Sequence, residues 1–138
     1  MVNSGFTTHG GLMAVVELTQ ENFEQIVTGN EMVLVDFWAP WCAPCRAFAP
    51  IFEAAAEKYP DVIFGKVNTD EEQELAGAFQ VRSIPMLTIF RQQIGIFSQA
   101  GSLPASALEQ VIEQAKGLDM EQVRAEIAAQ QQEDGGAH

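Results

Sequence analysis

The chain has 138 residues, 47% of them hydrophobic, which suits a single domain with one packed core. Its 19 acidic against 7 basic residues give a net charge of −12, which disfavours nucleic acid and anionic membrane surfaces as partners. No apolar run reaches the roughly 18 residues of a membrane span, and no basic residue of a secretion signal precedes Arg46, so we expect a cytoplasmic protein.

The residue pattern over the first 39 residues predicts a leader, a strand, a helix and a second strand. Residues 1–13 are rich in Gly, Ser and Thr and predict a flexible leader. Residues 14–18 suit a short strand, and Thr19 suits the N-cap of a helix that ends at Gly29. Residues 32–39 are almost all apolar, which is typical of a strand covered on both faces.

The middle of the chain continues this alternation of strands and helices. Apolar residues at three- and four-residue steps predict a helix from about Cys42 to Tyr59. A strand over 63–68 and a short helix over 71–79 follow, and strand–helix–strand order predicts a right-handed parallel crossover. Residues 86–90 and 96–99 then predict two strands joined as a hairpin.

The last part of the chain predicts two helices and a tail. Pro104 opens a helix for which Gly117 is the C-cap. Asp119 with Gln122 resembles a capping box for a further helix, and the polar, Gly-containing residues 130–138 predict disorder. The predicted organisation is a flexible leader over 1–13, one α/β domain over 14–117, and a helical extension with a disordered tail over 118–138.

Both cysteines lie in one motif, Trp41-Cys42-Ala43-Pro44-Cys45, where the buried strand meets the following helix. A disulfide that closes so short a loop stabilises a fold by only about 2 kcal/mol, against about 4.7 for a hundred-residue loop. The unpaired N–H groups and the dipole of a helix N-terminus favour a thiolate at the first cysteine. We therefore predict that Cys42 is the attacking thiol and that Cys45, one turn deeper, is the resolving thiol.

Two other interpretations of the cysteine pair remain open at this point. Free cysteines are often buried, so the two could be inert core residues. A structural zinc site needs four ligands, and the two histidines, His9 and His138, lie near the chain ends. The sequence therefore predicts no metal site.

A carboxylate interrupts the apolar strand that leads to the motif. A strand covered on both faces carries Asp36 inward, where burial raises its pKa and makes it a base for the proton of Cys45. The alternative is a strand-end Asp whose side chain reaches water. Lys66, on the next strand, is the candidate to moderate the charge of Asp36, or else a solvent-facing lysine.

Several motifs together resemble the thioredoxin family. They are Val35-Asp36-Phe37-Trp38-Ala39-Pro40-Trp41-Cys42-Ala43-Pro44-Cys45, Lys66-Val67-Asn68-Thr69-Asp70, Val81-Arg82-Ser83-Ile84-Pro85 and Ala100-Gly101. The resemblance covers about residues 15–116. It implies an α/β thioredoxin fold, with a central five-stranded mixed sheet flanked by four helices, to which this chain adds an extra C-terminal helix.

The resemblance also assigns roles to residues around the cysteines. It implies a cis Ile84–Pro85 bond opposite the motif and Asp36 as a buried base supported by Lys66 and Trp38. An apolar groove would receive a client peptide through backbone contacts. Its residues are Trp41, Ile84, Pro85 and Gly101, together with the motif residues Ala43 and Pro44.

The activity implied is that of a protein-disulfide reductase. It needs no bound cofactor, since the electrons come from NADPH through a separate thioredoxin reductase and pass through the Cys42–Cys45 pair to client proteins. We expect a monomer. Two rival functions stay open, a disulfide oxidant or isomerase and a non-catalytic binding module that uses the groove and the C-terminal extension.

The sequence departs from the family pattern in three places. Ala43 stands where Gly is typical. The dipeptide between the two cysteines, here Ala43-Pro44, tunes the redox potential of the family. Met86 follows Pro85 where Thr is usual, which makes the rim of the groove more apolar. The segment after Lys116 runs past the usual end of the fold, so the resemblance gives it no function; it suits a loosely packed acidic helix or a partner-docking element.

Overall fold

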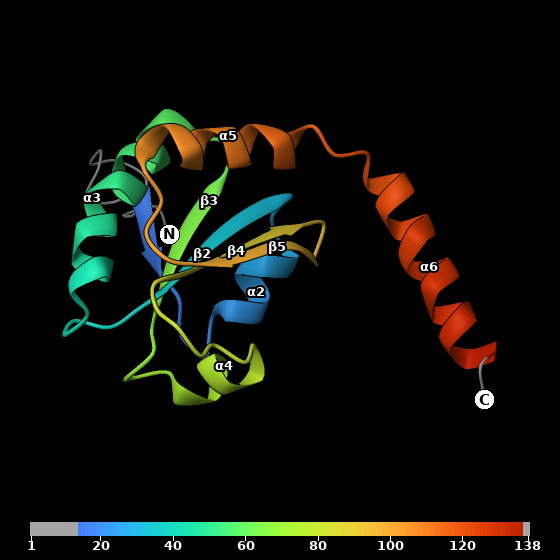
Figure 1. Cartoon of the computed structure of the whole chain (residues 1–138), viewed down its shortest axis with the longest axis horizontal. Helices are drawn as coiled ribbons and strands as arrows, with labels where there is room; N and C mark the ends of the chain where they lie inside the picture. Colours follow the sequence, from blue (N-terminus) through green and yellow to red (C-terminus); the bar gives the residue numbers. More distant parts are fainter. Residues whose placement is uncertain (1–13, 137–138) are drawn as a thin grey trace.

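The computed structural model describes residues 14–136, so the leader predicted over residues 1–13 lies outside the described part. At the centre is one five-stranded sheet in the order β1-β3-β2-β4-β5 (Figure 1). Strands β1, β3 and β2 are parallel, and β4 and β5 join β2 antiparallel, which confirms the predicted mixed sheet. The strands are β1 Val15–Glu17, β2 Met32–Trp38, β3 Ile63–Asn68, β4 Met86–Arg91 and β5 Ile94–Ala100.

Helices cover both faces of this sheet. The apolar side chains of α3 and α5 share one buried cluster, and those of α2 and α4 share another. Figure 1 shows the two pairs on opposite sides of the strands. The helices of the described part are α2 Phe23–Thr28, α3 Ala43–Lys58, α4 Gln73–Ala78, α5 Ala105–Lys116 and α6 Met120–Gly136.

The central strand β2 explains why the sequence of this region is almost continuously apolar. Met32 and Leu34 point toward α3 and α5, whereas Val33, Val35 and Phe37 point toward α2 and α4. Because successive side chains alternate between two buried faces, both faces need apolar residues. Asp36 lies on the same face of β2 as Met32 and Leu34, so its carboxylate lies on the side of α3.

The first helix begins later than we expected. Thr19 caps the turn just before α2 and not α2 itself: its Oγ1 accepts from the N–H of Glu21 at 3.3 Å, and its carbonyl oxygen accepts from the N–H groups of Asn22 and Phe23 at 3.2 and 2.9 Å. Asn22 occupies the N-cap position instead. The predicted end of the helix at Gly29 is confirmed, since Gly29 is its C-cap residue.

The C-terminal helix α6 differs from the prediction in length. Asp119 caps it as expected, since its Oδ1 accepts from the N–H groups of Glu121 and Gln122 at 3.0 and 3.2 Å. Gln122 does not complete the capping box, because its side chain donates to Glu126. We expected disorder from residue 130, but the helix continues to Gly136, in keeping with a sequence rich in Ala, Gln and Glu, which favour helix.

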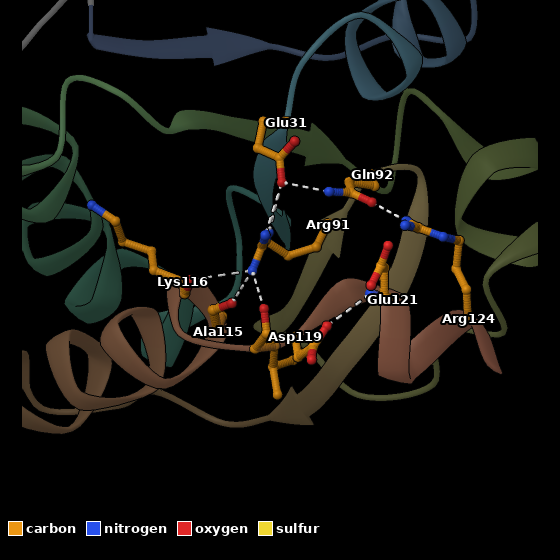
Figure 2. Close-up of polar contacts among 9 residues, drawn as sticks. Glu31, Arg91, Gln92, Ala115, Lys116, Asp119, Glu121 and Arg124 are labelled. Carbon is orange, nitrogen blue, oxygen red and sulfur yellow. Dashed lines mark hydrogen bonds and ion pairs between the residues drawn. The ribbon is translucent and has the colours of Figure 1, made fainter. Parts of the chain in front are cut away.

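Helix α6 projects away from the sheet and its covering helices (Figure 1). Its base is held by Arg91, at the end of β4, whose guanidinium donates to the carbonyl oxygens of Ala115, Lys116 and Leu118 (Figure 2). Beyond the buried Met120, most side chains of α6 that the structure describes are exposed. Among the helices of the described part, none combines the length and apolarity needed to cross a membrane.

Candidate active site

The two cysteines lie at the start of α3, directly after the carboxyl end of β2. Cys42 is the N-cap residue, in extended backbone conformation, and Cys45 lies in the first turn of the helix. Their Cα atoms are 5.2 Å apart and their sulfur atoms form a disulfide. Both side chains are buried, against Ala39, Trp38 and Ile84. The structure therefore brings the predicted pair together at the predicted junction.

The helix N-terminus points a donor at the sulfur of Cys42. The backbone N–H of Cys45 donates to Cys42 Sγ at 3.2 Å, which satisfies one of the N–H groups that a helix start leaves unpaired. Pro44 fits the first turn because its missing N–H has no partner there. In the dithiol form this geometry stabilises negative charge on Cys42 more than on Cys45.

The loop before β4 lies against the cysteines and forms the other side of the site. The Ile84–Pro85 peptide bond is cis, as the family resemblance implied, and the carbonyl oxygen of Ile84 lies 3.7 Å from Cys42 Sγ. The N–H of Gly101 donates to the carbonyl oxygen of Pro85 at 2.8 Å. Gly101 has a φ of +102°, which residues other than glycine rarely adopt.

The exposed rim of the site carries Trp41, Ala43 and Pro44. Trp41 has an exposed fraction of 67%, which is high for a tryptophan and leaves its ring available for contact. Its Nε1 donates to the two carboxylate oxygens of Asp70 at 3.0 and 3.2 Å. The N–H of Asp70 in turn donates to Asn68 Oδ1 at 2.9 Å, so the β3–α4 turn fixes the indole.

Sequence reasoning missed two contacts of this rim. Asp70 was visible only as part of a motif, although β2 and β3 are parallel neighbours and so bring Trp41 and Asp70 to the same edge of the sheet. The second contact joins Arg46 to Pro40, where Nη1 donates to the carbonyl oxygen at 2.9 Å. No pattern in the sequence signals that contact, because an exposed arginine on a helix usually faces solvent.

Beneath the disulfide, Asp36 is buried with an exposed fraction of 3%. Burial raises the pKa of its carboxyl group to about 7, and the positive charge of Lys66 lowers the pKa by a smaller amount. Lys66 pairs with Asp36 in the register of β2 and β3, and its Nζ lies 4.8 Å from the centre of the Trp38 ring. Lys66 is thus held over the indole, where its charge acts on Asp36 through space.

A cavity of about 70 Å³ separates Asp36 from the helix. Asp36, Trp38 and Lys66 line it from the sheet, and Cys45, Arg46 and Glu53 line it from α3. Asp36 Oδ1 and Trp38 Nε1 are buried without a hydrogen-bond partner among the described residues. The lining is mainly apolar, but Asp36 and Trp38 both lie on it, and a space of this volume has room for water. Within residues 14–136, no group of three His, Cys, Asp or Glu side chains is arranged to hold a metal ion.

Comparison with known proteins identifies the arrangement. The thioredoxin family model matches residues 14–114. "Putative thioredoxin 2" of Streptomyces coelicolor is 54% identical over 124 residues, 90% of this chain and 92% of that relative. The thioredoxin of Porphyra purpurea is 42% identical over 102 residues, 72% of this chain and 95% of its own.

A solved structure agrees with these relatives. A mutant thioredoxin from Halobacterium salinarum NRC-1 superposes with a TM-score of 0.71 at 32% identity, covering 76% of this chain and 93% of that one. The family brings with it thioredoxin reductase and disulfide-bearing clients as general partners. The chain therefore belongs to the thioredoxin family, as a protein-disulfide reductase whose redox centre is the Cys42–Cys45 disulfide.

Proposed function

We propose that Cys42 attacks client disulfides, that Cys45 resolves the resulting mixed disulfide, and that Asp36 is the base for the second step. The observation that carries this assignment is the hydrogen bond from the N–H of Cys45 to Cys42 Sγ. It stabilises a thiolate on Cys42 and not on Cys45, so the first cysteine is the one prepared to attack. Cys45 needs a base, and the cavity connects it to Asp36.

The reaction is an exchange of two electrons in two steps. The Cys42 thiolate forms a bond to one client sulfur, and the client S–S bond breaks and releases its other sulfur as a thiolate. Asp36 then takes the proton of Cys45 through the cavity, and the Cys45 sulfur attacks Cys42 Sγ. The bond between Cys42 and the client breaks, the second client sulfur leaves, and the Cys42–Cys45 disulfide remains.

The client binds along the groove formed by Trp41, Ile84, Pro85 and Gly101, with Ala43 and Pro44 on its rim. The position of the Ile84 carbonyl beside Cys42 Sγ supports this placement, because an extended peptide there meets backbone groups directly. Backbone contacts do not depend on client sequence, which suits an enzyme with many clients. Clients then differ in how they contact the exposed ring of Trp41.

After each reaction the Cys42–Cys45 disulfide must be reduced again. Thioredoxin reductase returns two electrons from NADPH to the disulfide, so the chain itself binds no cofactor. It acts as a monomer, since the groove and both cysteines come from one chain. A reductase of this kind works in the cytoplasm, where thiols are kept reduced.

Insulin reduction and single-turnover kinetics test the three roles. We expect Cys42→Ser to abolish insulin reduction and Cys45→Ser to accumulate a mixed disulfide with the client. We expect Asp36→Asn to slow the second step about 10-fold or more at pH 7 and to remove its rise between pH 6 and 8. Insulin reduction by Cys42→Ser at the wild-type rate would refute the order of attack. A second step with the wild-type pH profile in Asp36→Asn would refute the base.

A further inference from the structure

Arg46 joins the backbone just before the cysteine motif to the helix just after it. Its side chain starts one residue beyond Cys45, and its Nη1 donates to the carbonyl oxygen of Pro40 at 2.9 Å. This contact closes a loop that contains both cysteines. We call it the Arg46–Pro40 bracket. The two steps described above do not use this hydrogen bond, although the side chain of Arg46 also lines the cavity beside Asp36.

The bracket matters because the side-chain contacts of Cys42 do not survive its own reaction. Two backbone bonds remain: the N–H of Cys42 donates to the carbonyl oxygen of Ala39 at 3.2 Å, and its carbonyl oxygen accepts from the N–H of Arg46 at 3.1 Å. The contacts with the N–H of Cys45 and with the carbonyl of Ile84 both end on Sγ, the atom that reacts. Once a client is attached, Sγ carries the client sulfur, and the bond to Cys45 that held the loop in the oxidised form is open. The bracket involves no reacting atom, so the reaction itself does not break it.

We propose that Arg46 is a positioning residue for the second step, in which its bond to Pro40 keeps Cys42 within reach of Cys45 while the client is attached. The inference rests on the proposed order of attack by the two cysteines. Cys45 lies in the first turn of the helix, whereas Cys42 is the N-cap residue that joins the helix to the preceding loop. Restricting that loop raises the effective concentration of one sulfur at the other. The first step has no such dependence, because the client approaches from solution.

Stopped-flow kinetics with a small aromatic disulfide that releases thionitrobenzoate separates the two steps. The first anion leaves when Cys42 attacks, and the second leaves when Cys45 displaces the anion bound to Cys42. We expect Arg46→Met to slow the second phase roughly 3- to 10-fold, the range for loss of one ordinary hydrogen bond at an exposed site, and to change the first phase less than about 2-fold. Arg46→Lys keeps a cationic donor and should restore much of the second-phase rate.

Lys58→Met is the matched control. Lys58 is the last residue of the same helix and pairs with Glu109 on α5, so the variant has the same change in charge without touching the bracket. We expect both of its phases to keep the wild-type rates. The proposal is overturned if the second phase of Arg46→Met keeps the wild-type rate, or if its first phase slows equally. It is also overturned if Lys58→Met slows the second phase as much, because net charge would then be the cause.

Two further measurements separate failure of the Arg46 proposal from an unfolded variant and from failure of the proposed cysteine roles. Thermal unfolding of the oxidised variants verifies that each is folded, which we expect because Arg46 is exposed. Cys45→Ser should release one anion per chain. Release of two anions by Cys45→Ser would refute the proposed roles of the cysteines, whereas the Arg46→Met phases test the bracket alone.

Discussion

Helices α3 and α6 both begin with a polar cap after a short connection, yet the structure holds their first turns in different ways. At the start of α3, Cys42 is buried and contacts the loop before β4, and Asp36 lies beneath it on β2. At the start of α6, the cap residue Asp119 is exposed and Met120 is the buried anchor. Several buried elements thus fix the first helix start, and one polar cluster at the surface fixes the second (Figure 2).

The comparison indicates which substitutions should affect disulfide exchange and which should affect only the stability of a helix start. The buried contacts of the α3 start include the carboxyl group of Asp36, whose Oδ1 is buried without a hydrogen-bond partner among the described residues, which costs stability and suits the proposed base. The α6 start contains no such cost, because each of its charged groups lies at the surface or is paired. We therefore expect the largest effects at Asp36 and the smallest along α6.

Replacing Asp36 should give the largest change in stability. Its pKa is about 7 in the folded chain against 3.8 for the ordinary group, so the folded form binds more protons than the unfolded form between these values. Stability from this group therefore falls as pH rises from about 4 to about 7 and is constant above. We expect Asp36→Asn to remove this loss, and its stability relative to wild type to rise by about 2–3 kcal/mol from pH 5 to pH 8.

Urea unfolding of the oxidised wild type and Asp36→Asn at both pH values measures this difference. Asp61→Asn is a useful control, because Asp61 is exposed and pairs with Lys116 at the surface. An advantage of Asp36→Asn that is the same at pH 5 and pH 8 would show that Asp36 does not titrate between them.

Replacing Arg91 should have an intermediate effect, confined to the base of α6. Its side chain has an exposed fraction of 11%, pairs with Glu31 at 2.8 Å, and donates to three carbonyl oxygens at the end of α5 and just after it. We expect Arg91→Met to lower the free energy of unfolding by about 1–2 kcal/mol, because those carbonyls lose a charged donor. Insulin reduction by this variant should stay within about 2-fold of wild type.

Arg124→Met separates the base of α6 from its next turn. Arg124 is exposed and donates to the side chain of Gln92, which itself contacts Glu31 (Figure 2). We expect a change below about 0.5 kcal/mol for this variant. If Arg124→Met were as destabilising as Arg91→Met, the whole polar cluster, and not the guanidinium of Arg91, would hold the helix.

The sequence predicted the sheet and the redox pair because both depend on local patterns. The two-faced strand β2 has a continuous apolar run, which favoured an inward position for the Asp that interrupts it, and the structure places that Asp inside. The cis bond at Pro85 came from the family resemblance alone, since residue chemistry does not distinguish it from trans. The contacts of Trp41 with Asp70 and of Arg46 with Pro40 depend on side-chain directions that no periodicity encodes. The predicted end of α6 was wrong. The Gly and polar residues after residue 130 suggested disorder, although Ala, Gln and Glu favour helix.

Removing α6 beyond Met120 should have the smallest effect of all. The described side chains past Met120 are exposed or half-buried, and the helix points away from the sheet (Figure 1). A chain that ends at Met120 keeps the buried anchor, so we expect its free energy of unfolding to change by less than about 1 kcal/mol and its insulin reduction by less than about 2-fold. Urea unfolding and the insulin assay measure both. A large loss of reduction with unchanged stability would mean that α6 contributes to catalysis, and the contrast between the two helix starts would then fail.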